Sequence, residues 1–121
     1  MENVVVWFEL PVKKIDRAIT FYSKVFGYKF ETMEAGPNKM AMFPHEEGTV
    51  GGALVQSPES EPASVGTMLY LNGGKDLSKP LSKVKAAGGK IIQDKLEIGD
   101  HGFMAIFEDT EGNHVALHSE N

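Results

Sequence analysis

The chain has 121 residues, and 12 lysines and arginines against 17 aspartates and glutamates give it a formal net charge of −5 at pH 7. This length suits one domain with its own hydrophobic core, and an acidic balance without a basic run argues against a nucleic-acid partner. The absence of cysteine excludes disulfides and thiolate chemistry. The sequence shows no leader pattern, and no apolar run approaches the ~18 residues that cross a bilayer. We therefore expect a cytoplasmic protein without a membrane partner.

The first predicted elements are a strand and a helix. Residues 4–10 are β-branched and aromatic with a single charge and stop at Pro11, which predicts a strand covered on both faces. Residues 15–26 carry apolar side chains at i, i+3, i+4 and i+7, which predicts a helix with one buried stripe. Gly27 follows as the residue that ends this helix in a left-handed conformation.

Three further strands are predicted before a linker. Residues 28–33 alternate as a half-exposed strand does, and residues 40–43 follow a turn cluster. Residues 50–55 form the next strand, whose glycines leave the backbone bare, so we expect another group to pack close to it. Residues 57–64 are rich in proline, serine and glutamate and have no periodicity, which predicts a surface linker.

The same order of elements then repeats. A strand at 67–71, a helix from about Ser78 to the Gly88-Gly89 pair, and strands at 90–96, 103–107 and 114–118 are predicted. An offset of about sixty residues aligns Gly27 with Gly88 and Lys29 with Lys90. We therefore predict one α+β domain that comprises residues 1–121. It consists of two tandem βαβββ modules, residues 1–56 and 65–121, and their sheets enclose a shared concave ligand site.

Three segments carry a resemblance to a known family: Glu9-Leu10-Pro11-Val12, then Asp16-Arg17-Ala18-Ile19-x-Phe21-Tyr22 with Val25-Phe26-Gly27, and Glu108-Asp109-Thr110-Glu111-Gly112-Asn113. They look like the vicinal oxygen chelate superfamily of glyoxalases, bleomycin-resistance proteins and extradiol dioxygenases. The two ends of the chain look most like its lactoylglutathione lyase-related branch. The resemblance covers both modules. It implies a cup-shaped mixed sheet, in a protein that is often a dimer.

The resemblance implies the fold but not the family's metal chemistry. Metalloenzymes of this family carry four ligands on the first and fourth strands of the modules, and these positions fall on or beside Trp7, Ala53, Thr67 and Ala116. None offers the imidazole or carboxylate that such metals require. We therefore expect neither a metal ion nor another cofactor, which argues against glyoxalase I activity and iron-dependent ring cleavage.

Glu9 and His118 are the candidate catalytic residues. Glu9 is the only charge in an apolar strand and lies on the same face as Trp7, while His118 shares a face with Ala116. A His–carboxylate pair across the cup is a plausible acid–base unit at neutral pH. The alternatives are structural: a Glu9 carboxylate satisfied by backbone amides or a lysine, and a His118 close to the end of the chain.

Further residues are candidates for binding a ligand. Trp7 offers a stacking surface for a planar compound, or else it fills the hollow that the missing metal leaves. Thr67 offers one hydrogen bond, and His101 lies in a turn that leans over the mouth of the cup, or is a solvated loop histidine like His45. The predicted ligand-binding set is Trp7, Ala53, Thr67, Leu69, His101 and Ala116.

Two functions stay open at this point. One is a metal-independent lyase or isomerase in which Glu9, assisted by His118, moves a proton on a carbonyl compound. The other is a non-catalytic protein that binds or sequesters a small molecule. In addition to the small molecule, we expect a second copy of the chain as a partner in a homodimer. Half-open sheets leave edges and apolar faces that a second copy would cover.

Overall fold

The computed structural model describes residues 3–121, so the first two residues of the predicted first module lie outside the described part. The first module consists of β1 (Trp7–Pro11), α1 (Ile15–Phe26), β2 (Glu31–Ala35), β3 (Asn38–Met42) and β4 (Gly51–Gln56). The second consists of β5 (Tyr70–Asn72), α2 (Ser78–Val84), β6 (Lys90–Glu97), a 3-10 turn (Gly99–His101), β7 (Phe103–Glu108) and β8 (His114–Ser119). The predicted α+β class with two βαβββ modules is confirmed.

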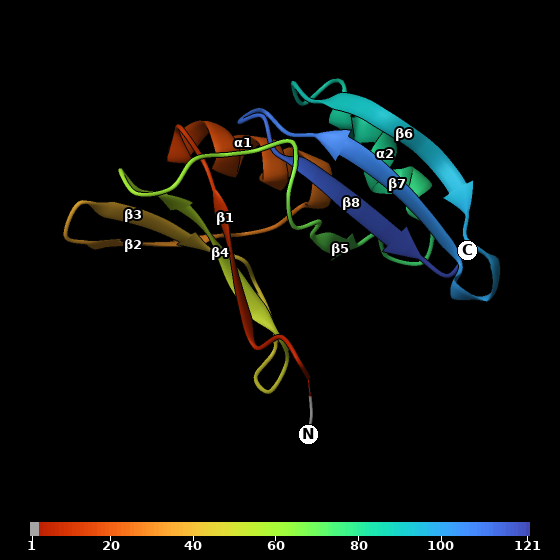
Figure 1. Ribbon diagram of the computed structural model, residues 1–121, viewed down its shortest axis with the longest axis horizontal. Coiled ribbons are helices and arrows are strands. Elements are labelled where there is room, and N and C mark those ends of the chain that lie inside the picture. The colour runs from red at the N-terminus through yellow and green to blue at the C-terminus, as the bar shows by residue number, and fades with distance from the viewer. Residues whose placement is uncertain (1–2) are drawn as a thin grey trace.

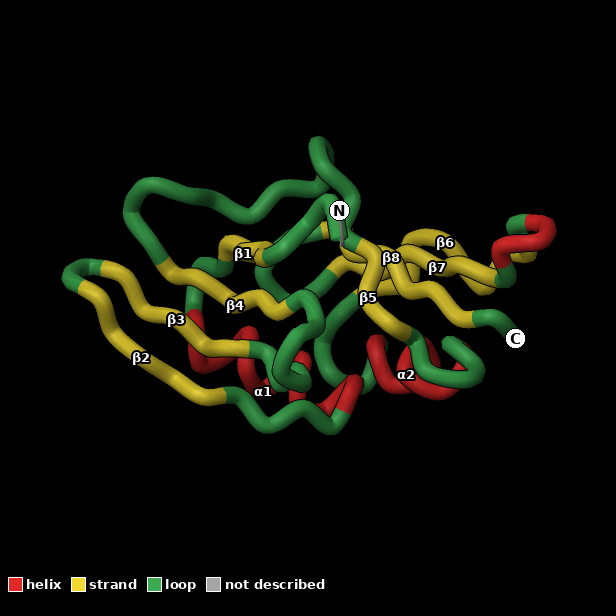
Figure 2. The backbone as a smooth tube through the Cα atoms, turned by 90° about the horizontal axis from the view of Figure 1, so that it is seen from below, coloured by secondary structure: helices red, strands yellow, loops and turns green. Residues whose placement is uncertain are grey.

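Each module folds into one mixed four-stranded sheet with the same strand order. The orders are β1-β4-β3-β2 and β5-β8-β7-β6, and the first and last strands of each module pair in parallel. Figure 2 shows the strands as one layer and the helices α1 and α2 as a second layer beneath them. In both views β1 and β5 lie toward the middle of the molecule (Figure 1), so the two sheets meet near these two strands.

The helix α1 forms because its apolar stripe is buried, as the sequence predicted. Ala18, Phe21, Tyr22 and Val25 are almost inaccessible to solvent. Gly27 ends the helix with φ of 77°, a left-handed conformation that glycine adopts without strain, and its N–H donates to the carbonyl of Ser23. The predicted bounds and the stop are both confirmed.

The two modules share one hydrophobic core. Phe21 of α1 packs against Phe107 of β7 with ring centroids 5.8 Å apart, and Tyr22 meets the same ring at 6.3 Å. Leu77 and Leu81, at the start of α2, belong to the same cluster of buried side chains. Because α1 lies against a strand of the other module, neither sheet buries its inner face alone.

The expectation that residues 4–10 form a strand covered on both faces is wrong. The strand begins only at Trp7, and Val4 and Val6 are 89% and 77% exposed. Only the helix-facing side of β1 is covered, and Leu10 is the one buried residue of the strand. The predicted strand at 67–71 likewise shortens to Tyr70–Asn72, where three pairs with β8 form the ladder.

The bare backbone of β4 is closely packed, as predicted, and the packing groups are side chains of the chain itself. A methyl group added at Gly51 would overlap the His45 ring, and one added at Gly52 would overlap the Phe8 ring. The glycines therefore make room for two aromatic rings. No helix within residues 3–121 is long and apolar enough to cross a membrane.

Candidate functional site

A groove of about 660 Å³ lies between the two modules, where β1 and β4 approach the start of β5. We call it the inter-module groove. Its lining is rich in aromatic side chains: Trp7, Phe8, Tyr28, Phe43 and Tyr70. Of the described residues, no aspartate, glutamate, lysine, arginine or histidine lines it. The groove is therefore suited to an apolar, planar molecule.

The aromatic side chains of the groove are held in place by one another. Phe43 is buried, and Phe8 and Tyr28 pack against it with centroids 5.3 and 5.6 Å away. Tyr28 also stacks on Phe26 at 4.8 Å, with an angle of 6° between the planes. Sequence reasoning missed Tyr28 and Phe43 as lining residues. The alternating aromatic residues at 26, 28 and 30 are the signal from which this cluster could have been found.

Trp7 and Glu9 lie side by side on the open face of β1. The indole N–H of Trp7 donates to a Glu9 carboxylate oxygen at 3.3 Å, and the His45 ring meets the indole edge to face at 6.4 Å. Glu9 is exposed, so its carboxylate is hydrated, and neither backbone amides nor a lysine is needed to satisfy it. It lines a separate pocket of about 260 Å³ beside His114.

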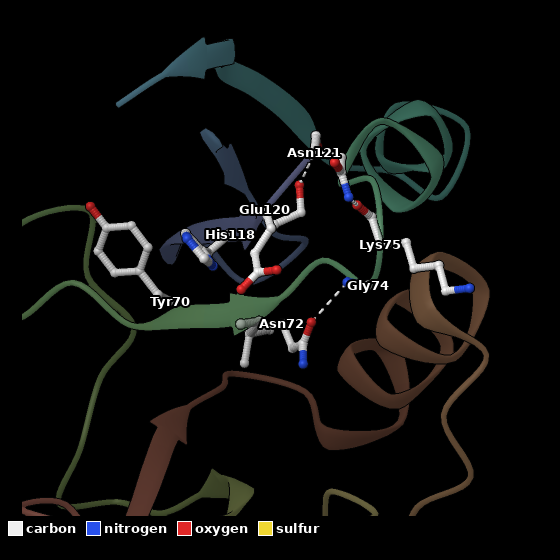
Figure 3. Close-up of a pocket in the computed structure, with 9 residues that line it drawn as sticks. Tyr70, Asn72, Gly74, Lys75, His118, Glu120 and Asn121 are labelled. Carbon is white, nitrogen blue, oxygen red and sulfur yellow. Dashed lines mark hydrogen bonds between the residues drawn. The ribbon is translucent and has the colours of Figure 1, made fainter. Parts of the chain in front are cut away.

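His118 lies on the other sheet, in a second and more polar pocket of about 760 Å³ (Figure 3). Its Nε2 contacts the carbonyl oxygen of His101, and because a carbonyl only accepts, Nε2 carries the hydrogen. Tyr70, Lys75 and Glu120 line the same pocket. The structure thus brings His118 and His101 together, and it places Glu9 and His118 in different pockets. A joint catalytic role for Glu9 and His118 stays a prediction.

The remaining predicted ligand-binding residues divide into two groups. Thr67 and Leu69 line the inter-module groove together with Trp7. Ala53 and Ala116 are completely buried, because larger residues flank each of them on the neighbouring strands: Glu9 and Met42 beside Ala53, Tyr70 and Ile106 beside Ala116. Contact of either alanine with a ligand would require these neighbours to move, so their role also stays a prediction.

The four positions to which the family resemblance assigns metal ligands carry no side chain that suits a metal ion. An indole, a hydroxyl and two methyl groups provide no anionic or imidazole donor. Within the part of the chain that the structure describes, no three histidine, aspartate or glutamate side chains are grouped so that they would hold an ion elsewhere.

The acidic segment between β7 and β8 joins the two modules. The buried Glu111 carboxylate accepts hydrogen bonds from Arg17 at 2.7 and 3.0 Å and from the backbone N–H groups of Lys13 and Lys14, at the start of α1. Burial alone would raise the pKa of Glu111, but these donors and the Thr110 hydroxyl outweigh it and hold the pKa below its ordinary value. Glu111 of the second module therefore fixes the backbone that leads into α1.

Asp109 forms the second half of this junction. It accepts hydrogen bonds from the buried Tyr22 hydroxyl at 2.8 Å and from the backbone N–H groups of Glu111 and Asn113. Burial raises the pKa of Asp109, and the hydrogen bonds offset only part of that effect. The Asn113 amide donates to the carbonyl of Pro11 at 2.7 Å, so this turn also touches the end of β1.

Comparison with known proteins places the chain in a family. The family model of the Glyoxalase/Bleomycin resistance protein/Dioxygenase superfamily matches residues 4–117. A glyoxylase-like domain-containing protein of Didymella fabae is 33% identical over 113 residues, which are 90% of this chain and 88% of that protein.

Solved structures share the fold. A hypothetical protein of S. aureus matches with a TM-score of 0.70 and 22% identity over 98% of this chain and 95% of that one. Glyoxalase I of Zea mays matches with a TM-score of 0.73 and 23% identity over 95% of this chain, which spans only 45% of the maize enzyme. The chain therefore belongs to the glyoxalase/bleomycin resistance protein/dioxygenase superfamily.

Proposed function

We propose that this superfamily member binds a small organic molecule in the inter-module groove, without the metal chemistry of its catalytic relatives. The observation that carries the proposal is the lining itself, which combines several preorganised aromatic rings with a volume of about 660 Å³. Ligand pockets in proteins commonly have volumes of about 300–1,000 Å³ and walls of this kind.

Binding is favoured over the lyase or isomerase alternative by the position of the ionisable groups. Of the described residues, neither Glu9 nor His118 lines the inter-module groove. The ionisable side chains that do line it are Tyr28 and Tyr70, and burial raises the pKa of Tyr28 further. A tyrosine that keeps its proton at neutral pH is a poor general base, so the groove lacks the group that proton abstraction from a carbonyl compound requires.

The proposal is tested with Trp7, the only tryptophan of the chain. We expect the neutral planar dye Nile red to bind saturably and to quench Trp7 fluorescence. Replacing Trp7 by alanine should weaken dye binding about ten-fold, because truncating an aromatic anchor removes stacking area. Leu96→Ala is the matched control, since Leu96 is a similarly exposed apolar residue on β6, at the far edge of the second sheet. Unsaturable binding, or equal weakening by both variants, would contradict the proposal.

A homodimer and a cytoplasmic location complete the proposal. The apolar side chains of Val4, Val6 and Val65 are 89%, 77% and 84% exposed, and a second copy would cover them together with the open edge of β1. We expect sedimentation equilibrium to give a dimer for the wild type and a monomer for Val65→Lys, while Ile92→Lys on β6 stays dimeric. A wild-type monomer at every concentration would refute the dimer. The lack of cysteine is in keeping with a reducing compartment.

A further inference from the structure

Tyr28 is one of the residues that line the inter-module groove, and its ring is held in a fixed position. Its ring stacks on Phe26 and meets Phe43 and Phe30 edge to face, with centroids 5.6 and 6.0 Å away. A ring held on several sides loses little further freedom when its hydroxyl binds a ligand. The hydroxyl is therefore preorganised to form a hydrogen bond in the groove.

This hydroxyl has no hydrogen-bond partner among the described residues, and burial is the single cause that raises the Tyr28 pKa. The contrast is with Tyr22, whose completely buried hydroxyl donates to Asp109. Within residues 3–121 every side-chain oxygen or nitrogen that is fully shielded from solvent has a partner, so the Tyr28 oxygen is still reachable from outside. It is a protonated donor at neutral pH that the fold leaves available.

The electrostatic character of the groove limits what this donor can bind. No charged side chain lines the groove in the part of the chain that the structure describes. A carboxylate or phosphate entering it would lose its hydration without gaining a counter-charge, which is strongly unfavourable. A neutral acceptor such as a ketone oxygen loses little hydration, and it regains a hydrogen bond from Tyr28.

We propose that the inter-module groove selects an uncharged, planar aromatic carbonyl compound whose carbonyl oxygen accepts a hydrogen bond from the Tyr28 hydroxyl. This inference rests on the proposed binding function and names the class of ligand for the same groove. It excludes substrates that carry carboxylates or phosphates into the groove.

Three naphthalenes of nearly equal shape test the proposal by displacement of Nile red, after the dye's own affinity for each variant is measured. They are 2-acetylnaphthalene, which is neutral with a carbonyl; 2-ethylnaphthalene, which lacks the acceptor; and the 2-naphthoate anion. We expect the ketone to bind about five-fold tighter than the hydrocarbon, as one added hydrogen bond allows. We expect naphthoate to bind at least about ten-fold more weakly than the ketone.

Tyr28→Phe removes only the hydroxyl and should reduce the affinity for the ketone to that for the hydrocarbon, whose own affinity stays unchanged. Thr32→Val is the matched control: it removes a side-chain hydroxyl from β2, outside the groove, and should leave the ketone's affinity unchanged. Equal melting temperatures of the two variants would establish that both are folded.

The outcomes separate this inference from the function on which it rests. If the hydrocarbon displaces the dye but the ketone gains nothing from Tyr28, or if naphthoate binds as tightly as the ketone, the ligand class is wrong and binding in the groove survives. If no naphthalene or dye binds, and Trp7 becomes shielded only as the protein self-associates, a second copy fills the groove, and both proposals fail.

Discussion

Replacing Glu111 by glutamine is expected to lower the free energy of unfolding by about 3 kcal/mol, because the change neutralises a fully buried carboxylate that is paired with Arg17. The Glu111 carboxylate is completely shielded, while Arg17 is 43% exposed, so Arg17 regains part of its hydration in the variant. The amide oxygen of glutamine can still accept from the backbone N–H groups of Lys13 and Lys14, which share Oε1 in the wild type. The second oxygen, Oε2, which accepts from Arg17 Nε and from the Thr110 hydroxyl, is replaced by an NH2 group that cannot accept. Urea unfolding at pH 7, followed by circular dichroism, measures the loss.

Glu108→Gln is the matched control for this prediction. Glu108 lies in the same segment and pairs with His114 at 3.0 Å, but both side chains are partly exposed. Replacing a carboxylate in such a pair should cost less than about 1 kcal/mol. If the Glu111 and Glu108 variants lost similar small amounts, Glu111 would not hold the modules together.

The effect of Glu111 also depends on pH in a defined direction. Its pKa is lowered in the folded state, so its stabilisation is complete above the pKa of the unfolded chain and is lost as the pH falls through the folded pKa. The stability difference between wild type and Glu111→Gln should therefore narrow below about pH 4.5. The raised pKa of Asp109 acts in the opposite sense, because the folded protein then binds that proton more readily than the unfolded chain does.

The spacing of apolar residues correctly predicted the elements that bury a single face. The stripe of α1 and its stop at Gly27 are set by residues within the helix itself, and the structure confirms both. The coverage of β1 was mispredicted because it depends on what packs over the two faces of the strand. An apolar strand composition does not show whether a second layer packs over both faces of the strand or over one.

The site was harder to predict because it is assembled from distant segments. The alternation of side chains along a strand predicts that Glu9 and His118 lie on open faces, but it does not predict how far apart the two strands lie. In the structure Glu9 pairs with Ala53 in one sheet, and His118 pairs with Asn72 in the other. The segment Glu108–Asn113 carried the family resemblance without revealing its task. Its partner Arg17 lies 94 residues away from Glu111 in the chain, beyond any local pattern.

Replacing Asp109 by alanine is expected to have the largest effect, a loss of about 4 kcal/mol in the free energy of unfolding, because it leaves several buried donors without an acceptor. The Tyr22 hydroxyl and the N–H groups of Glu111 and Asn113 all end on this carboxylate, at 2.8 to 2.9 Å. Urea unfolding at pH 7 measures the loss.

The double variant Tyr22→Phe/Asp109→Ala separates the orphaned hydroxyl from the other losses. Tyr22→Phe alone should cost about 2 kcal/mol, because a buried carboxylate loses one donor. In the double variant the donor and the acceptor are both absent, so the total loss should fall short of the sum of the single losses by at least about 1 kcal/mol. Additive losses would mean that the bond between the α1 tyrosine and the β7–β8 turn does not stabilise the junction. In that case the contact of Phe21 and Tyr22 with Phe107, together with the Arg17–Glu111 pair, would hold α1 against the second module.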